Sequence, residues 1–332
     1  MADQSPIKIA SPSPHAENAD KKPLSHLTQA FCGAIAGAAS RTIVAPLDVV
    51  KIRLQVQIEA VSGAAKYRTL GQSLTCILKE EGLVGLWRGT VPAVLFWMPY
   101  TAVQFAVLDG FKSWAKQGEV FKEKPALISF VGGAVAGVAA TLSSYPLDVV
   151  RTTLAAQGEP RVYHSVTGAI VGIYQSRGVA GLYAGVTPTL MEIIPHSAVQ
   201  FGTYDLLKSG IQASHRTIFK EDEAVYEVTP AEKFVCGLIS GAIAKSLIHP
   251  LDVVKKRMQI AGLKRNPLYG IAIQPNTYKG IFDCLQKILE REGAKGLFKG
   301  ITPALVKAAP ASGITLVLYE LFVNFAESFP DR

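Results

Sequence analysis

Six stretches of mostly apolar residues alternate with polar segments along this chain. They cover about residues 27–50, 90–111, 126–150, 186–207, 232–254 and 301–325. Each is long enough to cross a bilayer, which takes about 20 residues of helix. Gly, Pro, Ser and a few charges interrupt them, whereas a helix surrounded by lipid is almost uniformly aliphatic or aromatic. We therefore predict an all-α membrane protein with six transmembrane helices, each turning one face toward a polar interior.

The arrangement of spans recurs three times along the chain. The sequence PLDVV followed by a base occupies residues 46–51, 146–151 and 250–255, so the copies are 100 and 104 residues apart. A repeat of this length contains more than one element, and six spans over three copies give two spans each. Successive copies are then parallel, with both chain ends on the same side of the membrane. We predict one membrane domain of three pseudo-threefold repeats, at residues 26–119, 120–215 and 216–329.

Residues 1–25 precede the first repeat and differ from it in composition. They are rich in Pro, Ser and Lys, and they have neither an apolar core segment nor an Arg-rich amphipathic pattern. Such a composition predicts a disordered tail without a cleaved targeting signal.

Each repeated proline lies near the end of a predicted span, where it kinks the helix. An acid and, three residues later, a base follow each proline: Asp48 and Lys51, Asp148 and Arg151, Asp252 and Lys255. A charge at membrane depth costs about 2.5–3.5 kcal/mol on insertion scales, so pairing is favoured. An i, i+3 pair within one helix contributes only a few tenths of a kcal/mol. Pairing between repeats would instead close a ring, although the charges could also simply cap helix ends at the interface.

Two further polar patterns recur. Gln55 and Gln259 lie four residues beyond the first and third bases and could brace the ion pairs, or they could be surface glutamines; the second repeat has Ala155 there. The even-numbered spans end in a second set of charges with three acids but two bases, which predicts a weaker ring at the opposite face. Its members are Asp109 with Lys112, Asp205 with Lys208, and Glu320, which is followed by Val323 in place of a base.

Between the two spans of each repeat lies a polar segment that closes in EGLVGLWRG, RGVAGLYAG or EGAKGLFKG, at residues 81–89, 177–185 and 292–300. We expect a short amphipathic surface helix before each of them, for example at residues 70–79 and 281–290. The middle copy differs because Arg177 replaces the acid and Ala184 replaces the base.

Composition and charge narrow the class of function. The chain is 49% apolar and 18% charged, below the charge content of about 25% in soluble domains. Lys and Arg exceed Asp and Glu by eight, but they are spread through loops and span ends, which favours anionic lipid or an anionic solute over nucleic acid. The four cysteines lack CxxC spacing and are expected to be free thiols. Walker, GxSxG and HExxH motifs are absent from the sequence, so we do not expect an enzyme.

The motif PxDxxK or PxDxxR occurs three times. About 30 to 45 residues after its proline come a glycine and then an aromatic residue, a base and a glycine. Together these motifs resemble the signature of the mitochondrial carrier family over about residues 27–325. The resemblance implies tilted helices around a central cavity, surface helices on the matrix side, and alternating access across the mitochondrial inner membrane. It assigns the first set of charges to a matrix gate and the second to a cytoplasmic gate, which we call the matrix ring and the cytoplasmic ring. The implied pairs are Asp48–Arg151, Asp148–Lys255 and Asp252–Lys51 in the matrix ring, and Asp109–Lys208 and Glu320–Lys112 in the cytoplasmic ring.

Internal register then selects candidate substrate contacts. Counting 13 residues back from the acids that end the even-numbered spans reaches Phe96, Glu192 and Lys307, and members of the family bind substrate at equivalent points. Five residues before each repeated proline lie Arg41, Thr141 and Lys245; intramembrane bases are functional by default, although these could instead pair structurally with Glu192. Further candidates, for which helix packing is the alternative role, are Gln104, Gln200, Tyr100 and His196.

Residues 155–163, 244–263 and 297–309 are similar to stretches of the carriers of thiamine pyrophosphate within this family. This implies import of thiamine pyrophosphate as the substrate, in exchange for a nucleotide or another phosphate, with no cofactor. Its pyrophosphate suits Arg41, Lys245 and Lys307, and its cationic thiazolium and aminopyrimidine suit Glu192 and Phe96. The alternatives are a carrier of coenzyme A, adenine nucleotides or a related phosphate, and a non-transporting scaffold or proton-leak channel. We further expect a monomer, with membrane lipid such as cardiolipin at the surface-helix motifs.

Overall fold

The computed structural model describes residues 26–58, 66–117, 125–219, 228–263 and 277–327; the tail predicted for residues 1–25 lies outside the described residues. All regular elements in this part are helical, which confirms the predicted fold class. In chain order they are α1 (His26–Val56), α2 (Leu70–Gly85), α3 (Thr90–Gln117), α4 (Pro125–Ala156), α5 (Val166–Leu182), α6 (Val186–Phe219), α7 (Pro230–Gln259), α8 (Ile281–Glu292), the 3-10 helix η4 (Ala294–Phe298) and α9 (Ile301–Glu327).

Six long helices, α1, α3, α4, α6, α7 and α9, correspond to the six predicted spans. Within the described residues, five of them are both long enough and apolar enough to cross a membrane. The sixth, α6, is 34 residues long but carries polar and charged side chains such as Glu192, Asp205 and Lys208, which lower its hydropathy. It packs along α7 as its counterparts pack along their neighbours.

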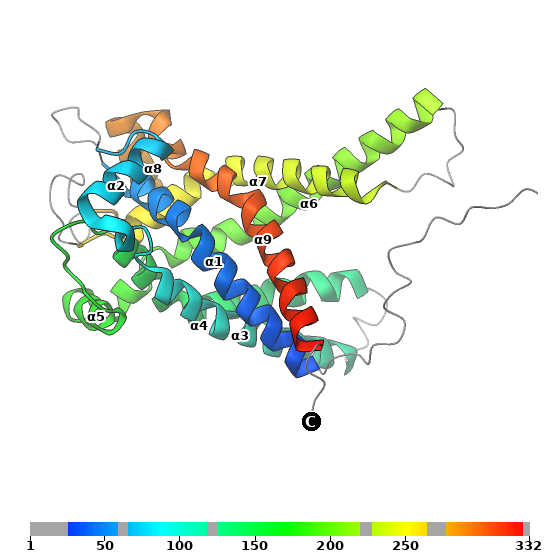
Figure 1. The fold of residues 1–332 in the computed structure, drawn as a ribbon, viewed down its shortest axis with the longest axis horizontal. Coiled ribbons are helices and arrows are strands. Elements are labelled where there is room, and N and C mark those ends of the chain that lie inside the picture. Colours follow the sequence, from blue (N-terminus) through cyan, green and yellow to red (C-terminus); the bar gives the residue numbers. More distant parts are fainter. Residues whose placement is uncertain (1–25, 59–65, 118–124, 220–227, 264–276, 328–332) are drawn as a thin grey trace, which may run out of the picture.

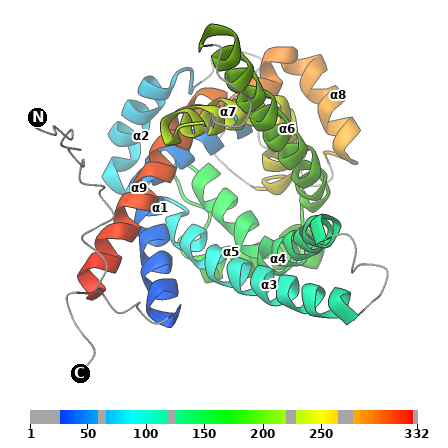
Figure 2. The same cartoon turned by 90° about the vertical axis from the view of Figure 1, so that its right-hand side faces the viewer.

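The long helices pair across the boundaries between repeats. α3 packs along α4, α6 along α7 and α9 along α1, whereas the two long helices of one repeat touch each other much less. Because the last long helix pairs with the first, the six close into a ring around a common axis (Figure 2). Figure 1 shows α2, α5 and α8 together at one end of this bundle, with the start of α1 and the end of α9 at the other end.

Proline residues lie inside all six long helices, and each helix continues past its proline. In α1, α4 and α7 the prolines precede the charges of the matrix ring, which therefore lie toward the end of the bundle where the three surface helices gather (Figure 1).

A glycine at the end of each surface segment brings one repeat against the next. These glycines have φ angles of 80°, 78° and 78°, a left-handed conformation that is strained for residues with a Cβ. A Cβ on them would also lie only 2.7, 2.9 and 2.9 Å from a carbonyl oxygen of the following repeat. That carbonyl belongs in each case to a base of the matrix ring: Gly89 meets Arg151, Gly185 meets Lys255 and Gly300 meets Lys51.

Candidate functional site

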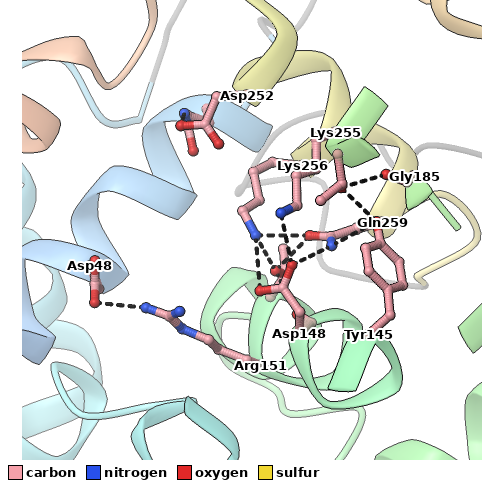
Figure 3. A network of polar contacts seen from close by, with 12 residues as sticks. Asp48, Tyr145, Asp148, Arg151, Gly185, Asp252, Lys255, Lys256 and Gln259 are labelled. Atoms are coloured by element: carbon pink, nitrogen blue, oxygen red, sulfur yellow. Dashed lines mark hydrogen bonds and ion pairs between the residues drawn. The ribbon is translucent and has the colours of Figure 1, made fainter. Parts of the chain in front are cut away.

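The matrix ring is closed by three ion pairs, each between neighbouring repeats. The carboxylate and cation are 2.7 Å apart in Asp48–Arg151, 3.1 Å in Asp148–Lys255 and 2.7 Å in Asp252–Lys51. These are the pairs that the family resemblance implies, and Figure 3 shows the residues of this ring from close by. Since the six side chains are only 7–19% exposed, further hydrogen bonds are needed to offset the loss of solvation.

Glutamine supplies such hydrogen bonds at two of the three acids. Gln259 donates from Nε2 to Oδ2 of Asp148 over 2.8 Å, and Gln55 donates in the same way to Asp252 over 3.4 Å. The hydroxyl of Tyr145 lies 3.2 Å from the same Nε2 of Gln259. The structure thus places both predicted bracing residues against the acids of the ring.

Each acid of the matrix ring also has a second cationic neighbour. For Asp48 and Asp252 this neighbour is a predicted substrate contact: Lys307 lies 2.5 Å from Asp48, and Lys245 lies 2.9 Å from Asp252. For Asp148 it is Lys256, at 3.5 Å, which is not among the predicted site residues.

Two of the predicted substrate contacts are close to each other. The ammonium of Lys245 lies 3.5 Å from Glu192 Oε1 and 2.9 Å from the ring acid Asp252, so the structural pairing that is the alternative role of Lys245 is present in this conformation. Lys245 is therefore held by two carboxylates in this conformation.

The aromatic candidates Phe96 and Tyr100 are also neighbours. Their rings stack with 5.5 Å between ring centroids.

Arg41 is held differently. Its guanidinium lies 3.7 Å from the ring centroid of Trp97 on α3, and no ion pair joins it to a carboxylate in the part of the chain that the structure describes. A cation over an indole face keeps its full charge, and such a contact contributes about 0.5–2 kcal/mol. Arg41 is thus positioned without being neutralised.

The remaining candidates have smaller roles in this conformation. Thr141 is buried, and its hydroxyl donates to the carbonyl of Gly137 in the same helix over 2.7 Å. Gln104, Gln200 and His196 are half-buried on α3 and α6, and their side chains make no hydrogen bond to any residue that the structure describes. Their contact with substrate stays a prediction.

The charges of the cytoplasmic ring lie apart from one another. Its three acids, Asp109, Asp205 and Glu320, are exposed, and within the described residues no ion pair involves them, Lys112 or Lys208. The molecule therefore combines a closed matrix ring with an unpaired cytoplasmic ring.

Buried arginines join the surface helices to the ends of the long helices. Arg53 makes a bidentate contact with Glu81, while its Nε and Nη2 donate over 3.0 Å to the carbonyls of Ala155 and Gln157 at the end of α4. Both charged side chains are almost fully buried. Because the carbonyls belong to the next repeat, this contact ties the first repeat to the second.

The third repeat makes the same contact with the first. Arg257 pairs with Glu292 at 2.6 Å and donates from Nε to the carbonyl of Gln55 over 3.1 Å. Burial alone would raise the pKa of Glu292, but the hydrogen bonds from Arg257 and Lys299 hold that pKa below its usual value. We call this arrangement and its counterpart at Arg53 the arginine clasps.

In the second repeat, the guanidinium that connects it to the third repeat comes from the surface helix and not from the long helix. Thr153 stands where the clasps have an arginine, and Arg177 stands where they have a glutamate. The guanidinium of Arg177 points to the end of α7 and donates to the carbonyl of Gln259 over 3.4 Å. The guanidinium thus comes from the surface helix, which accounts for the departure of the middle motif.

Comparison with known proteins identifies the chain. A family model described as "Mitochondrial carrier protein" matches residues 22–119, 122–215 and 226–329. The chain belongs to the mitochondrial carrier family. It is therefore a multi-pass transporter of the mitochondrial inner membrane and not an enzyme.

Individual relatives of this carrier match nearly its whole length. "Mitochondrial thiamine diphosphate carrier 2" from Zea mays is 47% identical over 321 residues, covering 91% of this chain and 95% of that protein. "Mitochondrial thiamine diphosphate carrier 1" from Arabidopsis thaliana is 46% identical over 316 residues, with coverage of 90% and 94%. "Mitochondrial thiamine pyrophosphate carrier" from Homo sapiens is 38% identical over 299 residues, with coverage of 89% and 91%.

Lys256, Trp97 and the arginines of the clasps were missed from the sequence. Lys256 is a second base directly after Lys255 in the third motif, where the first two repeats have Ile52 and Thr152. Comparison of the repeats therefore marks it as an additional charge. The signal for Trp97 was weaker, since it is one of several aromatic residues beside Phe96.

Proposed function

We propose that this carrier imports thiamine pyrophosphate into mitochondria by alternating access, in exchange for a nucleotide or another phosphate. Relatives that cover about nine-tenths of the chain bear the names of carriers of thiamine diphosphate or pyrophosphate. The observation in this chain that carries the proposal is the balance of charge at the centre of the helix bundle.

Leaving aside Lys256, which is buried against Thr152 and Gln259, six bases and four acids make up the matrix ring and the predicted substrate contacts beside it, so two positive charges are left over. A pyrophosphate group carries about −2 to −3 near neutral pH, given the acidity of phosphate groups, and suits this excess. The bases are Arg41, Lys51, Arg151, Lys245, Lys255 and Lys307, and the acids are Asp48, Asp148, Glu192 and Asp252.

Binding can be coupled to gating because two bases are shared between the substrate site and the ring. A pyrophosphate that enters from the cytoplasmic side finds Arg41 without a carboxylate partner and therefore able to bind it at once. It then competes with Asp48 for Lys307 and with Asp252 for Lys245. Substrate binding thereby removes one of the two cations from each of these ring acids and supplies differential interaction energy for a change of state.

In this scheme Glu192 exchanges one cationic partner for another. In the present conformation its carboxylate lies 3.5 Å from the ammonium of Lys245. When Lys245 turns to the pyrophosphate, the carboxylate loses that partner and can accept the cationic thiazolium, while Phe96 and Tyr100 offer ring faces to the aminopyrimidine.

Uptake into liposomes tests the proposal. We expect Lys307→Ala and Lys245→Ala to abolish thiamine pyrophosphate exchange, because each removes a phosphate contact worth about 1.5–3 kcal/mol or more. Glu192→Gln should weaken uptake of thiamine pyrophosphate more than uptake of ADP, which lacks the thiazolium. Lys233→Ala, at an exposed position on the same helix as Lys245, is the matched control and should transport normally.

The substrate panel should contain thiamine pyrophosphate, thiamine monophosphate, ADP and coenzyme A. Uptake of coenzyme A or ADP without thiamine pyrophosphate would favour the alternative phosphate carriers, which would use the same bases. No uptake of any of the four by folded protein would favour a scaffold or leak channel. Wild-type exchange in both lysine variants would contradict the site.

We also propose that the carrier acts as a monomer and binds anionic lipid such as cardiolipin between its repeats. A groove between the start of α2 and the start of α9 is lined by Arg68, Thr69, Lys299 and Gly300, and helix starts with nearby bases suit a phosphate headgroup. Cardiolipin should raise the melting temperature of the purified monomer more than phosphatidylcholine does; an equal effect would contradict lipid specificity.

A further inference from the structure

Each of the three corners of the matrix ring contains one acid and two cations. One cation is the predicted base from the neighbouring repeat, and the other is an additional lysine: Lys307 at Asp48, Lys245 at Asp252 and Lys256 at Asp148. The number of cations is the same at all three corners, but the second lysine does not come from the same position in each repeat.

Lys307 and Lys245 lie on the side from which substrate arrives, and their side chains are 26% and 23% exposed. Lys256 follows the ring base Lys255 directly, and its side chain is only 9% exposed. Its ammonium donates to Thr152 Oγ1 over 2.8 Å and to Gln259 Oε1 over 2.9 Å. Thr152 lies one turn nearer the end of α4 than Asp148, and Gln259 is the last residue of α7, so the partners of Lys256 lie on the side of the ring away from the predicted substrate contacts. Figure 3 shows Lys256 next to Asp148 and Gln259.

The second repeat cannot supply a cavity lysine of its own at this corner. Thr141 occupies the register position of Arg41 and Lys245, and its hydroxyl is bonded within α4. Without Lys256, Asp148 would therefore have Lys255 as its one ion-pair partner among the described residues, together with the amide of Gln259.

We infer that Lys256 is a positioning residue of the matrix gate, a second cation of Asp148 that substrate cannot remove. This rests on the proposed function, in which the pyrophosphate takes Lys245 and Lys307 away from the ring. The corners at Asp48 and Asp252 then loosen on binding, whereas the Asp148 corner keeps both its cations and opens last. Lys256 therefore limits opening of the matrix side when the site is empty or filled by a poorly fitting anion.

The test measures leak separately from exchange. Lys256→Gln should raise the efflux of loaded substrate in the absence of external counter-substrate by up to about tenfold, the factor that corresponds to about 1.4 kcal/mol. The KM for exchange should stay within about twofold, because the phosphate contacts remain, whereas Lys245→Gln should abolish exchange as Lys245→Ala does. The substrate-free variant should also melt at a lower temperature in detergent, with Lys233→Gln as the control.

Thr152→Val provides a second, milder variant. It keeps every charge but removes an oxygen that accepts a hydrogen bond from Lys256, so it should raise the leak in the same direction and by less. If Lys256→Gln and Thr152→Val both match wild type in leak and melting temperature, the inference is wrong even though exchange of thiamine pyrophosphate stands. If the wild type takes up no thiamine pyrophosphate, the proposed function fails, but the melting temperatures still report whether Lys256 stabilises the closed ring.

Discussion

At the scale of single residues, the bases of the site differ in how they are held before substrate arrives. Lys245 and Lys307 are paired with carboxylates, whereas the guanidinium of Arg41 rests on the indole of Trp97. An aromatic face orients a cation without cancelling its charge. Trp97 should therefore keep Arg41 available as a cation that an incoming phosphate can bind without displacing a carboxylate.

Replacement of this indole should weaken substrate capture. Trp97→Leu should raise the KM for thiamine pyrophosphate by roughly three- to tenfold, in line with a cation–π contact of about 0.5–2 kcal/mol, and Trp97→Phe should raise it less. Steady-state uptake in liposomes measures both.

The fluorescence of Trp97 offers an independent readout. In a variant that keeps Trp97 and replaces the two other tryptophans, Trp87 and Trp114, binding should move the guanidinium and change the emission. Unchanged KM values together with unchanged emission would contradict the role given to Trp97.

The residues of the ring pairs were predictable because the same acid and base recur at the same distance from three prolines. Register identifies which residues share a depth, and the charges then have few partners. Lys256 and Trp97 have no equivalents in the other repeats, and their importance depends on which neighbour each side chain meets. Only packing decides that, so comparison of the repeats could mark Lys256 as an additional base but could not identify the partner of Lys256 or of Trp97.

At the scale of elements, the arginine clasps attach the surface helices to the ring. A buried ion pair stabilises little relative to an apolar core, but loss of one partner costs about 3–5 kcal/mol because it leaves a buried charge unpaired. The surface helices thus depend on their glutamates, Glu81 in α2 and Glu292 in α8, to stay against the ends of the long helices.

This dependence predicts an effect of pH on stability. The pKa of Glu292 is lowered in the folded protein, so its contribution is present above the unfolded pKa of about 4.3 and is lost as the pH falls through the folded value. Glu292→Gln should lower the melting temperature at pH 7, and the difference from wild type should shrink below about pH 4. Glu290→Gln, at an exposed position on α8, should have little effect at either pH; a constant deficit of Glu292→Gln across this range would contradict the linkage.

The amphipathic pattern of a surface helix does not show where that helix ends. The segment predicted at residues 70–79 extends in the structure to Gly85, and the chain adopts a positive φ at Gly82 before it continues. Amphipathic alternation indicated where the helix begins, but the turn at Gly82 leads into contacts with the neighbouring repeat that a single repeat does not reveal.

At the scale of the whole molecule, a paired matrix ring and an unpaired cytoplasmic ring belong to a carrier whose matrix side is closed. The cytoplasmic ring is one base short, because Val323 takes the place opposite Asp205. Its closed form should therefore be the less stable of the two closed rings.

Supplying the missing base should change this balance. Val323→Lys would add a partner for Asp205 worth about 0.2–1 kcal/mol at an exposed site, which shifts the population of the matrix-open state up to about fivefold. Distances between spin labels at the cytoplasmic ends of α3 and α9 should shift toward shorter values. The double variant Val323→Lys with Asp205→Asn is the control and should restore the wild-type distribution; a shift that persists in it would mean that the lysine acts by another route.

The pairing of α9 with α1 has a consequence for how the protein is made. α1 is the first long helix of the chain and α9 is the last, yet they pack along each other and complete the ring. Until the final helix has entered the membrane, α1 has no neighbour on that side, and its partly buried Asp48 lacks the lysine that α9 provides. Assembly therefore cannot finish repeat by repeat, and a chain cut short before α9 would expose its first helix to recognition by quality-control proteases.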